Sequence, residues 1–527
     1  MTKSHNIEVL PQGRQIKGRD GKSLMEALVD SSIFLRSDCG GSGRCGKCRV
    51  KKISIYGEKE SITSCNSEVK ESLKIEIPES SMLSSHIISK ALLSFPPTFL
   101  KQKRTEDIEE SYGIAVDLGT TTIAVYLCNR SQGAVLSSLA IKNPQALYGD
   151  DVMSRIGAIG KDQSNLVRLQ RIVVNAIKWG SIELLRSHSL AKEDISQIVV
   201  VGNPTMIHIL SGVDPEPIGL SPYLPAFHEA RIVASETVGF ELGDSKLLTL
   251  PQISGFIGGD ILGAALATDL ENQPDGTLLI DLGTNGELLF KAGDRFFATS
   301  CATGPAFEGA SLTCGTQAIP GAINKIFINK RTDYPNYTTI NSVKKKQPTG
   351  LCGTGVISSI AELWRSEIID SGGAFIKDDS IRPLQRNAEA RLQYTIVKAN
   401  GTKGTDSVFI SQEDVRSVQL GKAALRTGID FLIRAAGYDE PTKIIIAGAF
   451  GAYVDKTDML AIGMIPKFDP EKIETAGNSA GAGAVMVLSD NHYLTKNVTM
   501  AEKTTIVDLA TDISFQSEFV KNLSFPH

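Results

Sequence analysis

The spacing of apolar residues divides the chain into a strand-rich start and a longer part in which strands and helices alternate. In residues 5–78, apolar and polar positions alternate in short runs such as IEVL and LKIEI, which is the period of half-buried strands. Between these runs, SLMEALVDSSI has the spacing of one amphipathic helix. From Gly113 onward, apolar strands alternate with helical segments, a pattern typical of α/β architecture. The sequence therefore predicts a small β-rich module followed by a larger α/β part.

Two segments of the α/β part repeat one pattern. YGIAVDLGTTTIAVYL (112–127) and GTLLIDLGTNGELLF (276–290) are each an apolar strand ending in Asp-Leu-Gly-Thr, a tight turn and a second strand. An internal duplication explains the repeat and predicts two similar lobes that face each other across a cleft. The expected parts are a first module at 1–79, a Pro-containing and charged linker at 80–110, a first lobe at 111–275, a second lobe at 276–492 and a tail at 493–527.

Composition is ordinary for a globular protein and narrows the range of functions. Of the 527 residues, 42% are hydrophobic and 22% are charged, and the formal net charge is −4. This balance gives no broad basic surface, which argues against nucleic acid as the main partner. The start MTKSHNIEVLPQG lacks the apolar run of a signal peptide, and no stretch reaches the roughly 18 uncharged apolar residues of a membrane span. We therefore expect a cytoplasmic location.

The eight cysteines fall into a crowded group and a scattered group. The crowded group has the spacing C-x5-C-x2-C-x16-C and consists of Cys39, Cys45, Cys48 and Cys65. In a reducing compartment, such a group favours a metal site over a disulfide framework. The scattered group, expected to be mostly small buried side chains, consists of Cys128, Cys301, Cys314 and Cys352.

The crowded cysteines predict an iron–sulfur cluster. A cluster with bridging sulfides needs four thiolates that converge on two irons, with backbone N–H donors close to the sulfur atoms. The glycines at 40, 41, 43 and 46 allow that close approach because they carry no Cβ. Zinc is the alternative. Structural zinc sites usually take their cysteines as two CxxC-type pairs, and this group contains one such pair.

The two Asp-Leu-Gly-Thr turns are candidates for binding the phosphates of one nucleotide. In each turn the glycine lets the backbone approach a phosphate, while hydroxyl and N–H groups can donate to its oxygens. The candidate contacts are Gly119, Thr120, Thr121 and Thr122 in the first turn and Gly283, Thr284 and Asn285 in the second. Asp117 and Asp281, at the strand ends, are candidates for holding Mg²⁺ through water. A single such turn would be weak evidence, since many merely close a hairpin, but the repeat favours a nucleotide.

Two further segments fit this interpretation. KIIIAGAFGAYVD (443–455) is an apolar strand followed by Gly448 and Gly451, as expected where a loop lies against an adenine and ribose. An ordinary glycine-rich turn is an equally good explanation of this segment alone. GFIGGDILGAALATDL (255–270) predicts a glycine-rich turn that enters a small-residue helix, with Asp260 near the helix start. Small residues there would let two lobes pack closely.

These elements together resemble two known families. Residues 5–78 resemble plant-type and adrenodoxin-like [2Fe–2S] ferredoxins, although the first gap between cysteines is five residues instead of the plant-type four. The two phosphate turns, the connecting helix and the adenosine segment resemble, in that order, the ASKHA superfamily of acetate and sugar kinases, Hsp70 and actin. The resemblance implies an α/β fold: a two-lobed, actin/Hsp70-like ATPase with a duplicated RNase H-like core and an N-terminal β-grasp ferredoxin-like domain.

The resemblance is closer still to one branch, the reductive activators of corrinoid-dependent enzymes, which join the two domains. The matching blocks are NPQALYGDDVMSRI (143–156), VVVGNPTMIHILSG (199–212), CATGPAFEGASL (301–312), TGLCGTGVISSIAEL (349–363) and AGAFGAYVD (447–455). This resemblance implies a [2Fe–2S] cluster, ATP and Mg²⁺ as cofactors. It also implies that ATP drives one electron from the cluster into a corrinoid protein of a methyltransferase system, returning inactive Co(II) to Co(I).

The resemblance leaves partners and alternatives open. It implies an electron donor such as a ferredoxin or flavodoxin, and a homodimer is a further expectation. Glu308 is a candidate for orienting the attacking water, and His208 is expected to have a structural role.

One alternative function is a small-molecule kinase whose ferredoxin module senses redox state, because such kinases share the phosphate turns. Another is a non-enzymatic electron-transfer or assembly scaffold in which nucleotide is structural.

Overall fold

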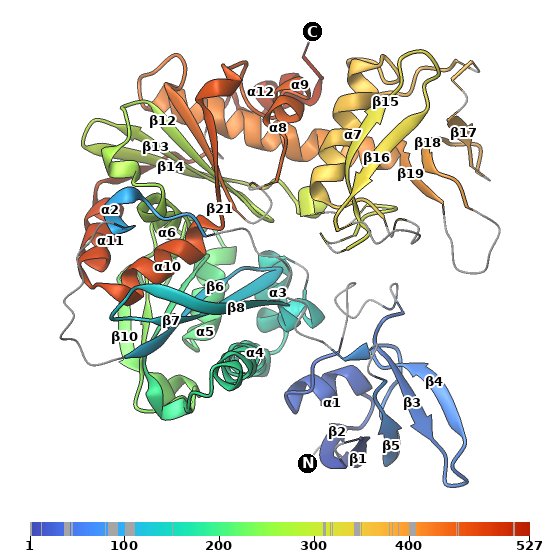
Figure 1. The fold of residues 1–527 in the computed structure, drawn as a ribbon, viewed down its shortest axis with the longest axis vertical. Coiled ribbons are helices and arrows are strands. Elements are labelled where there is room, and N and C mark those ends of the chain that lie inside the picture. The colour runs from blue at the N-terminus through green and yellow to red at the C-terminus, as the bar shows by residue number, and fades with distance from the viewer. Residues whose placement is uncertain are drawn as a thin grey trace. The chain divides into compact units, whose positions relative to one another are not determined.

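The computed structural model describes most of the chain (Figure 1). The described residues are 3–11, 13–35, 43, 46–78, 81–82, 93–100, 111–149, 151–308, 312–316, 318, 320–341, 348, 350–378, 380–381, 383–387, 389–399, 407–448, 451, 453–509 and 512–526. The chain forms two compact units. Unit 1 contains Met1–Ile87, Gln102–Asp260 and Ala484–Val498, and unit 2 contains Ile88–Lys101, Ile261–Gly483 and Thr499–His527. None of the helices in the described ranges combines the length and apolarity that a membrane span requires.

The first module is a five-stranded sheet with one helix. In spatial order the strands are β2 (Arg14–Arg19), β1 (Ser4–Leu10), β5 (Leu73–Glu76), β3 (Arg49–Ile53) and β4 (Lys59–Thr63). Strands β1 and β5 run parallel, and the other neighbours are antiparallel. Helix α1 (Leu24–Asp30) begins where the Ser23 hydroxyl accepts a hydrogen bond from the Glu26 amide. This arrangement confirms the predicted β-grasp domain, hereafter the ferredoxin module.

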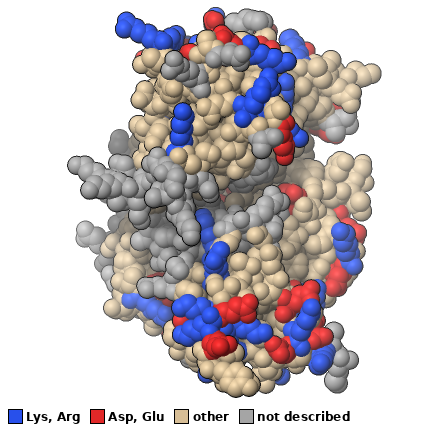
Figure 2. Space-filling view, turned by 90° about the vertical axis from the view of Figure 1, so that its right-hand side faces the viewer, with Lys and Arg blue, Asp and Glu red and all other residues tan. Residues whose placement is uncertain are grey.

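Charges on the ferredoxin module are balanced locally. Over this module, in the lower part of Figure 2, basic and acidic side chains lie intermixed. Two pairs link lysines of β3 to carboxylates, with Lys51 3.1 Å from Glu76 and Lys52 2.8 Å from Glu71.

The first lobe, in unit 1, contains a six-stranded sheet whose central strands carry the first hairpin. In spatial order the strands are β10 (Arg231–Ala234), β11 (Lys246–Thr249), β9 (Ile195–Gly202), β6 (Tyr112–Leu118), β7 (Thr122–Asn129) and β8 (Ala134–Lys142). Strands β6, β9 and β11 run parallel, whereas β7 and β8 follow as antiparallel hairpins. Strand β6 is almost wholly buried, as its continuous apolar run predicts.

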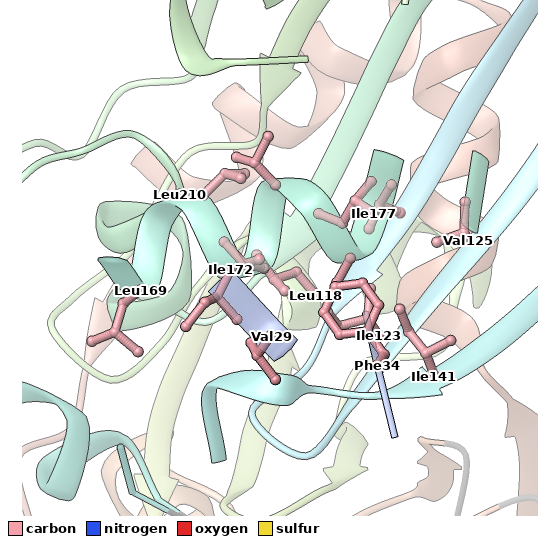
Figure 3. Close-up of a cluster of buried hydrophobic side chains, with 14 of the residues drawn as sticks. Val29, Phe34, Leu118, Ile123, Val125, Ile141, Leu169, Ile172, Ile177 and Leu210 are labelled. Carbon is pink, nitrogen blue, oxygen red and sulfur yellow. The ribbon is translucent and has the colours of Figure 1, made fainter. Parts of the chain in front are cut away.

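Helices cover this sheet and form its apolar core. They are α3 (Val152–Lys161), α4 (Ser164–Ser187) and α5 (Pro204–Leu210), together with the short 3₁₀ helix η2 (Pro144–Leu147). Helix α4 packs on β7 and β8. Its buried face includes Leu169, Ile172 and Ile177, spaced as a 3.6-residue period requires (Figure 3).

The second lobe, in unit 2, repeats this sheet. In spatial order its strands are β21 (Ile473–Gly477), β20 (Lys443–Ala447), β12 (Thr277–Leu282), β13 (Gly286–Ala292), β14 (Arg295–Cys301) and β22 (Thr504–Ile506). Strands β12, β20 and β21 run parallel, and β13 and β14 follow as antiparallel hairpins. The core of five strands therefore has the same connections and directions in both lobes, which confirms the predicted two-lobed α/β fold.

Further elements complete the two units. The helices are α2 (Pro97–Leu100), α6 (Gly259–Ala267), α7 (Gly353–Arg365), α8 (Gln412–Ala435), α9 (Lys456–Ala461), α10 (Ser479–Ser489), α11 (His492–Glu502) and α12 (Phe515–Leu523). Two small sheets contain β15 (Ile323–Ile328) with β16 (Pro335–Thr339), and β17 (Leu384–Arg386), β18 (Leu392–Val397) and β19 (Val408–Ser411). Short 3₁₀ helices are η3 (Lys192–Asp194), η4 (Glu216–Gly219), η5 (Ser235–Val238), η6 (Leu270–Asn272), η7 (Pro305–Glu308) and η8 (Pro470–Lys472).

The segment after residue 493, expected as a tail, is built into the fold. Strand β22 extends the sheet of the second lobe by pairing with β14, and α12 packs on α8. Phe525 is 1% exposed and stacks on Trp364 with ring centroids 5.7 Å apart. Of the expected linker 80–110, only 81–82 and 93–100 lie within the described residues.

Candidate functional site

Two of the four predicted cluster ligands lie within the described residues, and their sulfur atoms meet. Cys48 precedes β3 and Cys65 follows β4, so the pairing of Arg49 with Thr63 brings the two cysteines together. Their Sγ atoms are 3.3 Å apart, which is longer than the ~2.05 Å of a disulfide bond. Cys48 is 1% exposed and Cys65 is partly buried. Cys39 and Cys45 lie outside the described residues.

Two glycines near these ligands adopt backbone conformations that favour glycine. Gly43 and Gly46 have φ values of +80° and +62°, in the left-handed region that favours glycine. A Cβ on Gly43 would lie 2.6 Å from the side chain of Asn66, the neighbour of Cys65. Gly43 therefore lies close against the segment that carries the fourth ligand. Converging sulfur atoms and close glycine backbone fit a [2Fe–2S] cluster.

The scattered cysteines are mostly buried, as predicted. Cys128 and Cys301 are 0% and 3% exposed, and burial raises the pKa of the Cys128 thiol to about 12 and raises that of Cys301 as well. Cys352 is 1% exposed and donates its S–H to the Ile323 carbonyl oxygen at 3.2 Å. Cys314 is only partly buried.

The first phosphate turn has no room for a side chain at Gly119. A Cβ there would lie 2.7 Å from the Thr122 carbonyl oxygen, which also accepts the Gly119 N–H at 3.0 Å. Asp117, Thr121 and Thr122 are partly exposed. Thr120 is 6% exposed, and its Oγ1 accepts a hydrogen bond from Asn203 Nδ2 at 3.0 Å. The Thr120 hydroxyl is therefore held by the protein.

Three carbonyl oxygens of this turn are bound by residues to which the sequence interpretation gave no role. Asn143 donates through Nδ2 to Gly119 at 3.0 Å and through its backbone N–H to Thr121 at 2.8 Å. Arg155 Nη2 donates to the Thr120 oxygen at 2.6 Å. A peptide N–H points away from the carbonyl of the same planar unit. The N–H groups of residues 120–122 therefore point away from these donors, which suits a phosphate on the opposite side.

Arg155 also places a buried positive charge behind the turn. The residue is 0% exposed, and it donates through Nε to the Gly149 oxygen at 3.0 Å and through Nη1 to Gln145 Oε1 at 3.1 Å. A fixed cation near the turn raises the local potential, which favours a phosphate group. Asn143 and Arg155 both belong to the first matching block of the sequence. The resemblance of this block to the family was the one feature of the sequence that could have indicated a role for Asn143 and Arg155.

The second phosphate turn lies beside the adenosine segment. Strands β12 and β20 pair in parallel with Asp281 opposite Ala447, so Gly448 follows directly beside the turn. Gly448 has φ +93°, and a Cβ there would lie 2.5 Å from the Leu282 oxygen and 2.7 Å from Asp281 Oδ1. Asp281 is 9% exposed. The structure thus brings together two predicted motifs that are far apart in sequence.

The remaining candidate residues of the second lobe also lie in closely packed backbone. The Gly283 N–H donates to the Asn285 oxygen at 3.0 Å, and the Thr284 oxygen accepts a hydrogen bond from Thr303 at 3.1 Å. A Cβ on Gly451 would lie 2.2 Å from the Ala447 oxygen. The two hydrogen bonds hold the backbone of the second turn in place, and the Gly451 backbone lies too close to Ala447 to carry a side chain.

Two other candidates have different outcomes. Glu308 ends η7, but its side chain lies outside the described residues, so its role stays a prediction. His208 is 0% exposed, with Nδ1 2.7 Å from the Pro204 oxygen, while Nε2 accepts the Ala226 N–H at 2.9 Å. Burial lowers the pKa of His208. These contacts confirm the structural role expected for His208.

The two phosphate turns belong to different compact units. Asp117 and its turn lie in unit 1, whereas Asp281, its turn and Gly448 lie in unit 2. That both turns bind one nucleotide across a cleft therefore stays a prediction.

Family models match nearly the whole chain. Residues 7–71 match the 2Fe-2S iron-sulfur cluster binding domain, 112–273 match the RACo middle region, and 275–527 match the C-terminal domain of RACo, the ASKHA domain. The chain is 32% identical over 443 residues to the corrinoid activation enzyme RamQ of Eubacterium limosum, covering 82% of this chain and 72% of that protein. It is 26% identical to the Co(II) methylated amine-specific corrinoid protein reductase of Methanosarcina barkeri, covering 79% of this chain and 77% of the relative.

A solved structure agrees with the sequence matches. The reductive activator for a corrinoid, iron-sulfur protein superposes with a TM-score of 0.73 at 27% identity, covering 99% of this chain and 98% of that one. The agreement thus includes the ferredoxin module and both lobes. The chain therefore belongs to the RACo family of corrinoid reductive activators, with a [2Fe–2S] domain joined to an ASKHA ATPase domain.

Proposed function

We propose that this chain uses ATP to drive one electron from its ferredoxin module to the cobalt of a corrinoid protein, converting inactive Co(II) to Co(I). The observation that carries the proposal is that one chain contains both a cysteine set fit for a cluster and two candidate phosphate-binding turns. The names of the two curated relatives, a corrinoid activation enzyme and a Co(II) corrinoid protein reductase, support the choice of substrate.

The cysteines supply the electron-carrying part of this proposal. Cys39, Cys45, Cys48 and Cys65 would hold the [2Fe–2S] cluster, which supplies one-electron chemistry when bound. The β3–β4 pairing fixes Cys48 and Cys65 relative to each other. Such fixed ligands limit the rearrangement that accompanies a change of charge at the site.

The phosphate turns supply the driving part. Asp117 and Asp281 would hold Mg²⁺ through water, while Thr121, Thr284 and the turn N–H groups donate to phosphate oxygens. Glu308 remains our candidate for orienting the attacking water. Each 59 mV of unfavourable one-electron gap costs a factor of ten in equilibrium. ATP can offset this gap in reduction potential only if ATP binds the partner-engaged state of the protein more tightly, or is hydrolysed when the protein leaves that state.

One assay tests the function directly. Reduced protein is mixed with a Co(II) corrinoid protein, and the Co(I) absorbance is followed with and without MgATP. We expect Co(I) to form only with MgATP. Replacing Asp117 or Asp281 by Asn should slow the reaction by about 10- to 100-fold, the usual cost of disturbing the surroundings of a metal ion. Equal Co(I) signals with and without MgATP would contradict the proposal.

The wider setting belongs to the same proposal. We infer a cytoplasmic protein that receives its electron from a donor such as a ferredoxin or flavodoxin and that acts as a homodimer. The kinase alternative would require phosphoryl transfer to an added metabolite independently of cluster reduction. The relatives do not support it, because both are named for corrinoid proteins.

A further inference from the structure

The ferredoxin module contacts the first lobe beside the phosphate turn. Val29 of α1 and Phe34, which follows it, join the same apolar cluster as Leu118 and Ile123, the residues that flank the turn (Figure 3). Phe34 meets Trp179 of α4 edge to face, with ring centroids 6.4 Å apart. The apolar cluster therefore includes residues of the strands that carry the turn.

An ion pair fixes the position of α1 on α4. Asp30, at the end of α1, lies 2.6 Å from Arg171 of α4 and 3.3 Å from Arg19 of its own module. The Asp30 side chain is 17% exposed. One arginine from each side thus holds a largely buried carboxylate, which makes the contact directional as well as apolar.

An apolar pocket within this contact connects two functional segments. Leu35 of the ferredoxin module lines it, and so do Asn143, Pro144 and Leu147 of the first lobe. Leu35 lies four positions before Cys39 in the sequence. Asn143 is the residue that holds two carbonyl oxygens of the phosphate turn. The wall of the pocket thus connects the start of the cysteine loop to the turn.

We propose that residues 142–147, the relay segment, dock the chain's own ferredoxin module and release it when nucleotide occupies the phosphate turn. This inference rests on the proposed function and supplies its regulation. Asn143 is bonded to the turn at two points, so a phosphate that displaces the turn displaces the surface against which Leu35 lies. Nucleotide can shift this contact only by binding the released state more tightly than the docked state.

Release would serve the electron-transfer step. When the module is docked, the first lobe covers Phe34 and Leu35, which precede the cysteine loop. Undocking would expose this face to a partner protein. If the module were instead fixed rigidly to the first lobe, nucleotide would leave these contacts unchanged. The contact between Phe34 and Trp179 distinguishes release from rigid attachment.

Trp179 reports on docking without any need for a corrinoid protein. The chain contains two tryptophans, Trp179 and Trp364. The full-length Trp364→Phe protein keeps an aromatic ring against Phe525 and leaves Trp179 as the only indole. We expect a non-hydrolysable ATP analogue with Mg²⁺ to shift Trp179 emission to longer wavelength, because undocking removes Phe34 from the indole.

A matched pair of charge reversals on α4 tests the cause. Arg171→Glu repels Asp30, so we expect the shifted emission without nucleotide and no further response to it. Lys178→Glu reverses a charge on the same helix, but Lys178 pairs with Glu241 of its own lobe at 3.2 Å. It should therefore respond like the parent protein. The inference is overturned if the parent binds the analogue, as measured by calorimetry, without an emission change. A parent-like response of Arg171→Glu overturns it equally.

The corrinoid assay separates this inference from the function on which it rests. If Co(I) forms with MgATP while Trp179 does not respond, the relay is wrong and the function stands. If Trp179 responds as expected and Co(I) never forms, the relay stands and the function is wrong.

Discussion

Asn203 is a single residue that serves two elements. Its Oδ1 accepts the Met206 amide at 3.0 Å as the N-cap of α5, and its Nδ2 donates to Thr120 Oγ1 at 3.0 Å. Asn at the N-cap followed by proline at the first helical position is a favourable helix start. The second bond could not be predicted, because it joins residues that follow two different strands and meet only once β6 and β9 are paired.

The Asn203–Thr120 bond can be tested without loss of the helix cap. Asn203→Ser keeps a capping hydroxyl but is too short to reach Thr120. Loss of this hydrogen bond should lower the free energy of unfolding by about 0.5–1.5 kcal/mol, measured by denaturant unfolding. Thr120→Val removes the same bond from the other side, so the double variant should lose little more than either single variant. Fully additive losses would show that the two residues act separately.

Elements illustrate both the success and the limit of pattern reasoning. The strands that carry Asp117 and Asp281 were predictable, because buried parallel strands require continuous apolar runs. The repeat of Asp-Leu-Gly-Thr likewise predicted the duplicated sheets. The contact of Gly448 with Asp281 required the observed parallel register of β12 and β20, which the local pattern does not contain.

Two glycines of the second lobe separate backbone strain from crowding. Gly293, at φ +61° between β13 and β14, has open space where a Cβ would lie. Gly293→Ala should therefore cost only the left-handed strain of about 1–2 kcal/mol. Gly448→Ala adds a clash with Leu282 and Asp281, so we expect a further loss of about 1–3 kcal/mol and weaker ATP binding. Denaturant unfolding and ATP titration measure both effects. Equal losses in the two variants would contradict the crowding argument.

At the scale of the whole molecule, the sequence predicted the order of the modules better than their limits. The ferredoxin module and two lobes follow from motifs that each lie within a short stretch. The end of the chain does not, because its place depends on distant partners. Phe525 donates its N–H to the Ser371 oxygen at 2.8 Å, and Gln419 Nε2 donates to the Leu523 oxygen at 2.9 Å. A short apolar run mixed with charge gives no sign of such contacts.

Metal content distinguishes the two groups of cysteines in the intact protein. Replacing any one of Cys39, Cys45, Cys48 or Cys65 by Ser should remove most of the bound iron and the visible absorbance of the cluster, because each supplies one of four thiolates. Cys314→Ser, at a partly buried position outside the group, should keep both. Iron and zinc analysis of anaerobically purified protein provides the measurement. Zinc in place of iron in the parent protein would disprove the cluster.

The β3–β4 hairpin also limits how this protein can vary. Because Cys48 and Cys65 flank paired strands, the distance between their sulfur atoms depends on strand register. Each residue inserted into one strand advances the chain by about 3.3 Å and turns the following side chains to the other face. Insertions in β3 or β4 would thus separate the ligand pair. The turn at residues 54–58, which includes the exposed Ile55 and Tyr56, can instead lengthen or shorten without moving either sulfur. Natural variants should therefore differ in length at the far end of this hairpin.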